Sequence, residues 1–161
     1  MVHFSILILT IGIPGAGKSS WVKKYVERHP HTHVISTDVI RKECTGEEQC
    51  VDPSQNDWIH DEARRRAKKI IDDPASYGAK AVGFGPEIII DSTNVCVDEW
   101  LRYKKLGASV IVAKIFDVSV DEAMRNQENR ERKVPRNIVQ SKFEDLEKNK
   151  KYLKQVFNMI L

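Results

Sequence analysis

The segment from Gly12 to Ser19 carries the residue types of a phosphate-binding loop. It matches the pattern G-x-x-x-x-G-K-[ST], and it follows an apolar stretch that favours a strand. Glycines let consecutive backbone N–H groups turn toward phosphate oxygens, and the start of the next helix adds partial positive charge. Lys18 is expected to reach the β- and γ-phosphates, and the Ser19 hydroxyl is expected to bind Mg²⁺. The residues assigned to the nucleotide here are Gly12, Pro14, Gly15, Ala16, Gly17, Lys18, Ser19 and Ser20.

Asp91 is the second candidate metal residue. It ends the short apolar run Glu-Ile-Ile-Ile-Asp over residues 87–91, which favours a buried strand. In phosphate-binding-loop proteins, an acid at the end of such a strand lies beside the loop and holds Mg²⁺, usually through water. The alternative is that Asp91 caps a helix that begins in the following Ser-Thr-Asn segment.

Asp38 is the candidate general base for an acceptor hydroxyl. It follows a predicted strand over residues 33–36, and we expect the C-terminal ends of the first and second strands to lie side by side. That arrangement places Asp38 near the γ-phosphate, where a carboxylate can accept the proton of a nucleophile. Arg41 follows one helical turn later and can face the same cleft. The alternative is a helix-capping Asp38 with Arg41 on the surface.

Two segments are rich in basic residues. Arg125, Arg130 and Arg132 surround a predicted helix end that leads to Pro135, as expected for a lid that closes over phosphates. Guanidinium groups bind phosphate oxygens bidentately and keep their charge, so a lid arginine is suited to the transferring group. The other segment, residues 64–69, reads Arg-Arg-Arg-Ala-Lys-Lys. For both, the alternative is a solvated helix surface.

Strands and helices are expected to alternate along the whole chain, which predicts an α/β fold with a mostly parallel sheet between two helical layers. Residues 78–86 are expected to form an irregular loop. The last helix is expected around Val139, Phe143 and Leu146, with Leu153, Phe157 and Ile160 extending its apolar surface. The other predicted elements are strands at 4–11, 33–36, 87–91 and 110–116, and helices at 19–27, 57–72, 97–106 and 119–129.

The composition fits one globular domain over residues 1–161. Hydrophobic residues make up 41% of the chain, and 26 Lys and Arg against 23 Asp and Glu give a net charge of only +3, which does not by itself indicate nucleic-acid binding. The apolar run near the N-terminus is too short for a membrane span and lacks the features of a signal peptide. Three cysteines without a CxxC pattern make a disulfide framework or a zinc site unexpected, so a cytoplasmic protein is the simplest expectation.

The ordered set of motifs resembles the bacteriophage-type polynucleotide 5′-hydroxyl kinases. The similarity begins at residues 10–21 around the phosphate-binding loop and continues through Asp38 with Arg41. It then takes in Ser-Thr-Asn at 92–94, Phe-Asp-Val at 116–118 and the segment from Arg125 to Pro135. These segments occur in the family's order and span nearly the whole chain.

The resemblance implies a kinase that transfers the γ-phosphate of ATP to the 5′-hydroxyl of DNA or RNA, with Mg²⁺. It implies that Lys18 and Ser19 serve the phosphates and the metal, that Asp38 is the general base and that Arg41 orients the acceptor nucleotide. A lid arginine would stabilise the transition state, and Arg130 and Arg132 compete for that role because their spacing departs from the family's pattern. No D-x-D-G-T motif of the phosphatase domain found in some relatives follows.

Two other functions fit the same motifs less well. One is a small-molecule kinase that acts on a nucleoside or another alcohol. The other is a nucleotide-dependent binding module, which has no need of the Asp38–Arg41 pair. GTPases are disfavoured because the guanine-binding pattern N-K-x-D is absent; the segment 149–152 fails at its last position.

Overall fold

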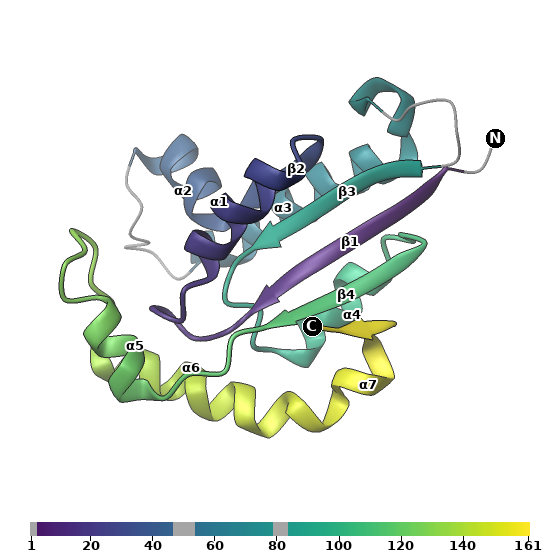
Figure 1. Ribbon diagram of the computed structural model, residues 1–161. Coiled ribbons are helices and arrows are strands. Elements are labelled where there is room, and N and C mark those ends of the chain that lie inside the picture. Colours follow the sequence, from purple (N-terminus) through teal and green to yellow (C-terminus); the bar gives the residue numbers. More distant parts are fainter. Residues whose placement is uncertain (1–2, 47–53, 79–83) are drawn as a thin grey trace.

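The structure is a computed structural model that describes residues 3–46, 54–78 and 84–161 (Figure 1). A sheet of five parallel strands, in the order β2-β3-β1-β4-β5, forms its centre. The strands are β1 (Phe4–Ile11), β2 (Thr32–Ser36), β3 (Phe84–Asp91), β4 (Val110–Ile115) and β5 (Met159–Ile160). A parallel sheet with helices on both faces confirms the predicted α/β sandwich.

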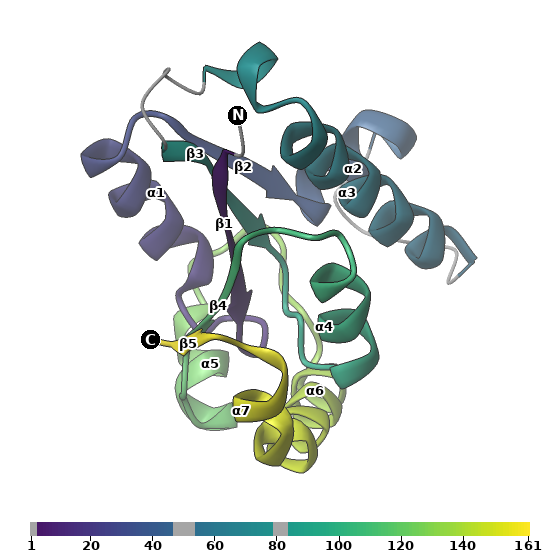
Figure 2. The same cartoon turned by 90° about the vertical axis from the view of Figure 1, so that its right-hand side faces the viewer.

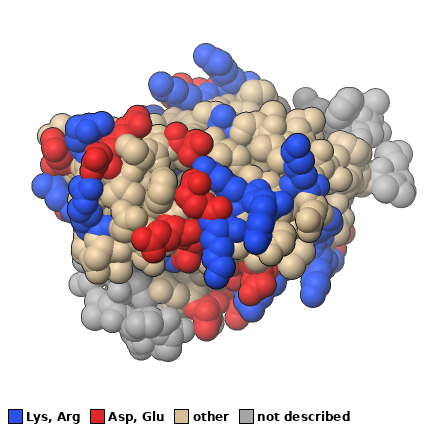
Figure 3. All heavy atoms as spheres, turned by 90° about the horizontal axis from the view of Figure 1, so that it is seen from below, with Lys and Arg blue, Asp and Glu red and all other residues tan. Residues whose placement is uncertain are grey.

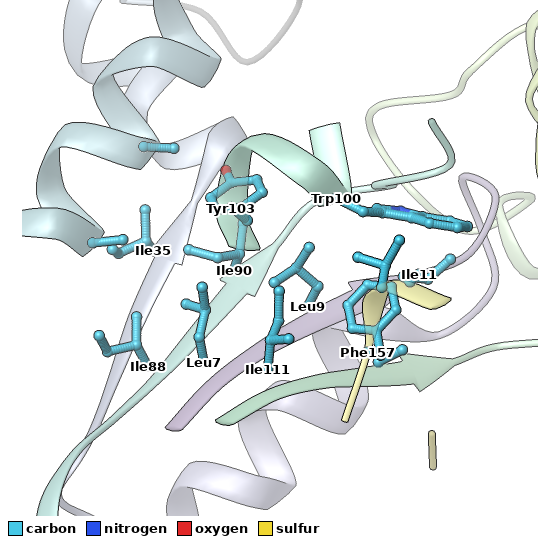
Figure 4. Close-up of a cluster of buried hydrophobic side chains, with 14 of the residues drawn as sticks. Leu7, Leu9, Ile11, Ile35, Ile88, Ile90, Trp100, Tyr103, Ile111 and Phe157 are labelled. Carbon is cyan, nitrogen blue, oxygen red and sulfur yellow. The ribbon is translucent and has the colours of Figure 1, made fainter. Parts of the chain in front are cut away.

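The central strands are apolar over most of their length because both of their faces are covered. Leu7 and Leu9 of β1 and Ile88 of β3 are completely buried on one face, where the larger core forms (Figure 4). Ile8 and Ile89 belong to a smaller cluster on the other face. Continuous burial of this kind is typical of parallel strands and explains why the runs of Ile and Leu do not alternate with polar residues.

The helices form two layers, with α1 on one face of the sheet and α3 and α4 on the other (Figure 2). In the part of the chain that the structure describes, no helix is both long and apolar enough to span a lipid bilayer. The helices are α1 (Lys18–Arg28), α2 (Thr37–Thr45), α3 (Ser54–Asp72), α4 (Val97–Lys104), α5 (Val120–Asn126), α6 (Arg136–Asn149) and α7 (Leu153–Val156), with short 3₁₀ turns η1 (Pro74–Tyr77) and η2 (Lys150–Tyr152).

The strand order corrects one expectation. We expected β1 and β2 to be neighbours, but β3 lies between them and pairs with both. β3, with its buried run of three isoleucines, takes an interior place in the sheet, whereas β2 takes the edge, where Val34 is exposed. The consequence for the site is that Asp91, at the end of β3, lies between the phosphate-binding loop after β1 and the acidic residue after β2.

Three element boundaries also differ from expectation. β3 begins at Phe84 and includes Gly85 and Pro86, so the expected irregular loop is shorter; residues 79–83 lie outside the described part. α5 ends at Asn126 instead of residue 129. Ile160 does not extend a helical surface, because it lies in β5, a two-residue strand paired with β4 at the sheet edge. So short a strand leaves no periodic signal in the sequence.

Candidate active site

The phosphate-binding loop connects β1 to α1 and has the backbone shape that its glycines permit. Gly15 and Gly17 have φ values of 86° and 92°, a region that other residues rarely adopt. A side chain at Gly15 would also collide with α5, because an added Cβ would lie 2.3 Å from the carbonyl oxygen of Ala123. The amide of Gly12 donates to the carbonyl of Thr93 at 3.0 Å, which fixes the loop beside the end of β3. The remaining predicted nucleotide residues lie in this loop or in the first turn of α1: Pro14, Ala16 and Ser20.

Lys18 is the first residue of α1 and is buried in the site. Its Nζ donates to the carbonyl of Ile13 at 2.7 Å, within the same loop. Burial lowers the pKa of Lys18 to about 8, the charges of Asp91 and Asp38 oppose that shift, and the charge of Arg130 adds to it. The predicted phosphate ligand is therefore close to both candidate acids and to one lid arginine.

Ser19 and Asp91 meet at the position expected for a metal. The Ser19 hydroxyl donates to Oδ2 of Asp91 at 3.1 Å. Burial raises the pKa of Asp91 and the charge of Asp38 adds to this, while Ser19, Lys18 and Arg130 oppose it. Asp91 ends β3 and does not cap a helix, since α4 begins after Cys96.

A hydroxyl and a carboxylate oxygen fit Mg²⁺, which prefers hard oxygen ligands completed by phosphates and water. Across residues 3–46, 54–78 and 84–161, no group of three or more His, Cys, Asp or Glu side chains could hold a metal without a nucleotide. Cys44 and Cys96 are free thiols, and Cys50 lies outside the described residues. The donor set therefore suits a metal that arrives with a triphosphate.

Asp38 lies in the first turn of α2 and is held by two arginines. Ser36, not Asp38, caps this helix by accepting from the amide of Val39, which removes the capping explanation of Asp38. Nη1 of Arg41 donates to Oδ1 of Asp38 at 2.6 Å, and Nη1 of Arg132 lies 2.7 Å from the same oxygen. The Arg41 side chain is 9% exposed, so it is an interior group and not a surface arginine.

The second oxygen of Asp38 is available to a substrate. The Asp38 side chain is 53% exposed, and within the described residues its Oδ2 accepts no hydrogen bond. The charge of Asp38 acts on both Lys18 and Asp91, so Asp38 belongs to the same electrostatic site as the phosphate-binding loop. An acceptor hydroxyl at Oδ2 would thus approach a phosphate bound at Lys18.

The three lid arginines occupy different environments. Residues 127–134, here called the arginine loop, follow α5 and are seen at the left of Figure 1. Arg130 is the lid arginine whose charge acts on Lys18 and Asp91, whereas Arg132 pairs with Asp38. Arg125 is exposed on α5, and its charge acts on Asp121 of the same helix. The structure therefore brings Arg130 and Arg132 to the site and gives Arg125 no ion pair within the described residues.

Two residues that sequence reasoning did not select connect this loop to the phosphate-binding loop. Nδ2 of Asn126 donates to the carbonyl of Gly15 at 2.9 Å. Oε1 of Gln127, a 2% exposed residue, accepts from the amide of Val134 at 2.9 Å. No sequence motif marks these two amides.

The basic run of α3 is neutralised by acidic partners. Arg64 pairs with Asp61 and Glu99, Arg65 pairs with Glu62, and Arg66 pairs with Glu62 and Glu43. Lys68 pairs with Asp72. The structure therefore supports the simpler interpretation of this run as an ion-paired helix surface.

Known proteins share this fold. The family AAA_33, described as an AAA domain, matches residues 7–155. A chain of the Pnkp1/Rnl/Hen1 RNA repair complex superposes with a TM-score of 0.73 at 17% identity, covering 94% of this chain and 47% of that one. A chain from a second structure of that complex gives 0.61 at 20% identity, covering 83% and 44%. A gluconokinase from Sinorhizobium meliloti 1021 gives 0.60 at 14% identity, covering 89% and 76%.

The chain thus spans about half the length of the repair-complex chains that it matches. At these identities, the likenesses show a shared fold and not a shared substrate. The family match covers nearly the whole described chain, including the phosphate-binding loop, Asp38, Asp91 and the arginine loop. On that match, and with the fold of P-loop kinases, the chain belongs to the AAA domain family AAA_33.

Proposed function

We propose that this protein transfers the γ-phosphate of ATP to the 5′-hydroxyl of a polynucleotide end, DNA or RNA. The observation that carries the proposal is the Asp38 carboxylate: Arg41 and Arg132 hold its Oδ1, Oδ2 accepts no hydrogen bond within the described residues, and its charge acts on Lys18. A protein that only binds or hydrolyses a nucleotide does not need a carboxylate presented in this way to an acceptor.

The transfer needs few groups. The acceptor oxygen forms a bond to the γ-phosphorus while the bond from that phosphorus to the β,γ-bridging oxygen breaks, and the hydroxyl proton passes to Asp38. Lys18 and Arg130 would neutralise the charge on the transferring oxygens, and Ser19 and Asp91 would hold Mg²⁺, which polarises the phosphates when bound. Arg41 would orient the acceptor through its phosphate, since a guanidinium binds phosphate oxygens in a defined geometry.

Two features support a polymeric acceptor over a small one. The motif order from residue 10 to Pro135 resembles the polynucleotide 5′-hydroxyl kinases, and the solved chain that superposes at a TM-score of 0.73 belongs to an RNA repair complex. In addition, Asp38 is half exposed, so an acceptor that reaches it can continue away from the protein.

A small-molecule kinase is the second candidate, and the ion pairing of α3 favours it. That pairing removes a basic surface that could have bound a nucleic-acid backbone. The face of the molecule seen from below also carries acidic groups next to basic ones (Figure 3). Electrostatic binding of a long phosphate backbone needs lysines and arginines that can neutralise its phosphates, because this neutralisation releases the counterions of the backbone. The small-molecule candidate therefore rests on the paired charges of α3, and the polynucleotide candidate rests on the geometry of the site.

The test offers labelled ATP and Mg²⁺ to 5′-hydroxyl DNA and RNA oligonucleotides, nucleoside 3′-monophosphates, free nucleosides and gluconate. Transfer to oligonucleotides that falls steeply with added salt would support the polynucleotide proposal. Transfer confined to a small alcohol, insensitive to salt, would favour the second candidate.

Asp38→Asn is the matched control, because it keeps the side chain's size but removes the proton acceptor. It should lower kcat strongly and leave ATP affinity unchanged. Loss of ATP binding in this variant would instead place Asp38 in the metal site.

A further inference from the structure

Gln127 is a buried polar residue with no assigned role, and it makes contacts on two sides. Its backbone carbonyl accepts from the amide of Arg130 at 3.0 Å, and its side-chain Oε1 accepts from the amide of Val134 at 2.9 Å. Its Nε2 lies 3.6 Å from the sulfur of Met124, one helical turn earlier. Gln127 therefore joins both ends of the arginine loop, which carries Arg130 and Arg132 between them.

The same side chain lies against the phosphate-binding loop. A Cβ added at Gly15 would come within 3.1 Å of Cγ of Gln127 and 2.3 Å of the Ala123 carbonyl oxygen. The neighbouring Asn126 donates to the carbonyl of Gly15 at 2.9 Å. Gln127 thus lies close enough to Gly15 that a side chain added there would press against it.

The loop that Gln127 closes ends at the candidate base. Arg132 crosses from the arginine loop to Oδ1 of Asp38 in α2, 94 residues earlier in the chain. Among the described residues, this is the ion pair that joins the arginine loop to the acceptor side of the cleft. An arginine on an open loop would lose conformational entropy in reaching Asp38, and closing the loop in advance reduces that cost.

We propose that Gln127 is a positioning residue that keeps the arginine loop closed against the phosphate-binding loop, so that Arg132 holds the Asp38 carboxylate in place. Gln127 does not touch the reacting atoms. It acts through Arg132, and the proposal rests on the proposed function only in treating Asp38 as the group that meets the acceptor.

The first test needs no substrate, so it separates this proposal from the proposed function. Gln127→Met keeps the side chain's size but removes the oxygen that accepts from Val134. Tryptic cleavage after Arg130, Arg132 and Lys133, followed by mass spectrometry, should become about tenfold faster, the effect of losing one buried hydrogen bond. Gln127→Glu retains an acceptor oxygen and should be cleaved like the wild type. Gln140→Met, on the exposed side of α6, is the control.

Unchanged cleavage in Gln127→Met would overturn the proposal. If that variant fails to fold, Gln127→Asn, which withdraws the oxygen by one methylene, provides the same comparison.

The second test measures coupling between Gln127 and Arg132. Transfer is followed in Gln127→Met, Arg132→Ala and the double variant, with the active acceptor or, failing any acceptor, with water. Since Gln127 acts through Arg132, the double variant should lose no more kcat than Arg132→Ala alone, and KM for ATP should stay within about twofold. Multiplicative losses in kcat would show that Gln127 acts independently of Arg132 and would contradict the proposal.

Discussion

The arginines of α3 find acidic partners on their own helix or on a neighbouring helix, whereas the arginines of the arginine loop face the site. In α3, Glu62 lies three and four residues before Arg65 and Arg66 and binds both, which lowers the pKa of Glu62 to about 2. In the arginine loop, Arg132 pairs with Asp38 on another element, and Arg130 acts on Lys18.

The difference shows that the number of arginines does not indicate function. In a helix, residues three or four apart are neighbours, so acidic residues one turn away neutralise a basic run within the same helix. Glu128 and Glu131 of the arginine loop lie outside any helix and form no such pairs in the part of the chain that the structure describes, so the arginines can pair with distant partners.

Lys18→Ala sets the scale for this comparison and should have the largest effect. Removing the buried cation at the transferring phosphate should lower kcat by at least about 1000-fold. Transfer of labelled phosphate measures the loss, and circular dichroism checks that the fold is retained. A well-folded and fully active variant would refute the assignment of the phosphate-binding loop.

Arg130→Ala should have the next largest effect. If Arg130 stabilises charge on the transferring group, kcat should fall by about 100-fold, which corresponds to about 2.7 kcal/mol. Arg125→Ala is the matched control from the same lid segment and should stay within a few-fold of wild type. Mild effects at both positions would mean that the lid is only a solvated helix end.

Arg132→Ala should act on the base and not on the phosphate. We expect kcat to fall by about tenfold in an otherwise unchanged protein, with much less further loss when Asp38→Asn is already present, because contacting residues couple. Single-turnover transfer by the two single variants and the double variant provides the measurement. Equal losses with and without the Asp38 carboxylate would show that Arg132 contacts the substrate instead.

Arg65→Ala and Arg66→Ala should have the smallest effects. Exposed ion pairs are weak because water screens them, so the free energy of unfolding should hardly change and transfer should stay within about twofold. Urea unfolding and the transfer assay check both values. A large loss of transfer to oligonucleotides, but not to small acceptors, would indicate that α3 binds nucleic acid.

Local features of the molecule could be predicted from the sequence. The phosphate-binding loop, β1 and the start of α1 follow from glycines, an apolar run and a helix start that are contiguous in the chain. The start of α5 is likewise close to the expected residue 119, because the Ser119 hydroxyl caps this helix by accepting from the amide of Glu122. These signals lie within a few consecutive residues, so they can be recognised in a single sequence.

Non-local features could not be predicted in this way. The position of β3 between β1 and β2 depends on which strand is best buried in the assembled sheet. The pair between Arg132 and Asp38 depends on how two distant elements meet. Gln127 was missed because its importance comes from Gly15 and Val134, which neither charge nor periodicity reveals.

The edge position of β2 has a consequence for how the two halves of the cleft open. β1, which leads to the phosphate-binding loop, is paired on both sides, whereas β2, which leads to Asp38 and Arg41, is paired with β3 alone. Backbone groups on the outer side of an edge strand are the first to exchange hydrogen with water, since they open without global unfolding. The side of the site that carries Asp38 and Arg41 can therefore open locally while the side that carries the phosphate-binding loop stays protected by the interior of the sheet.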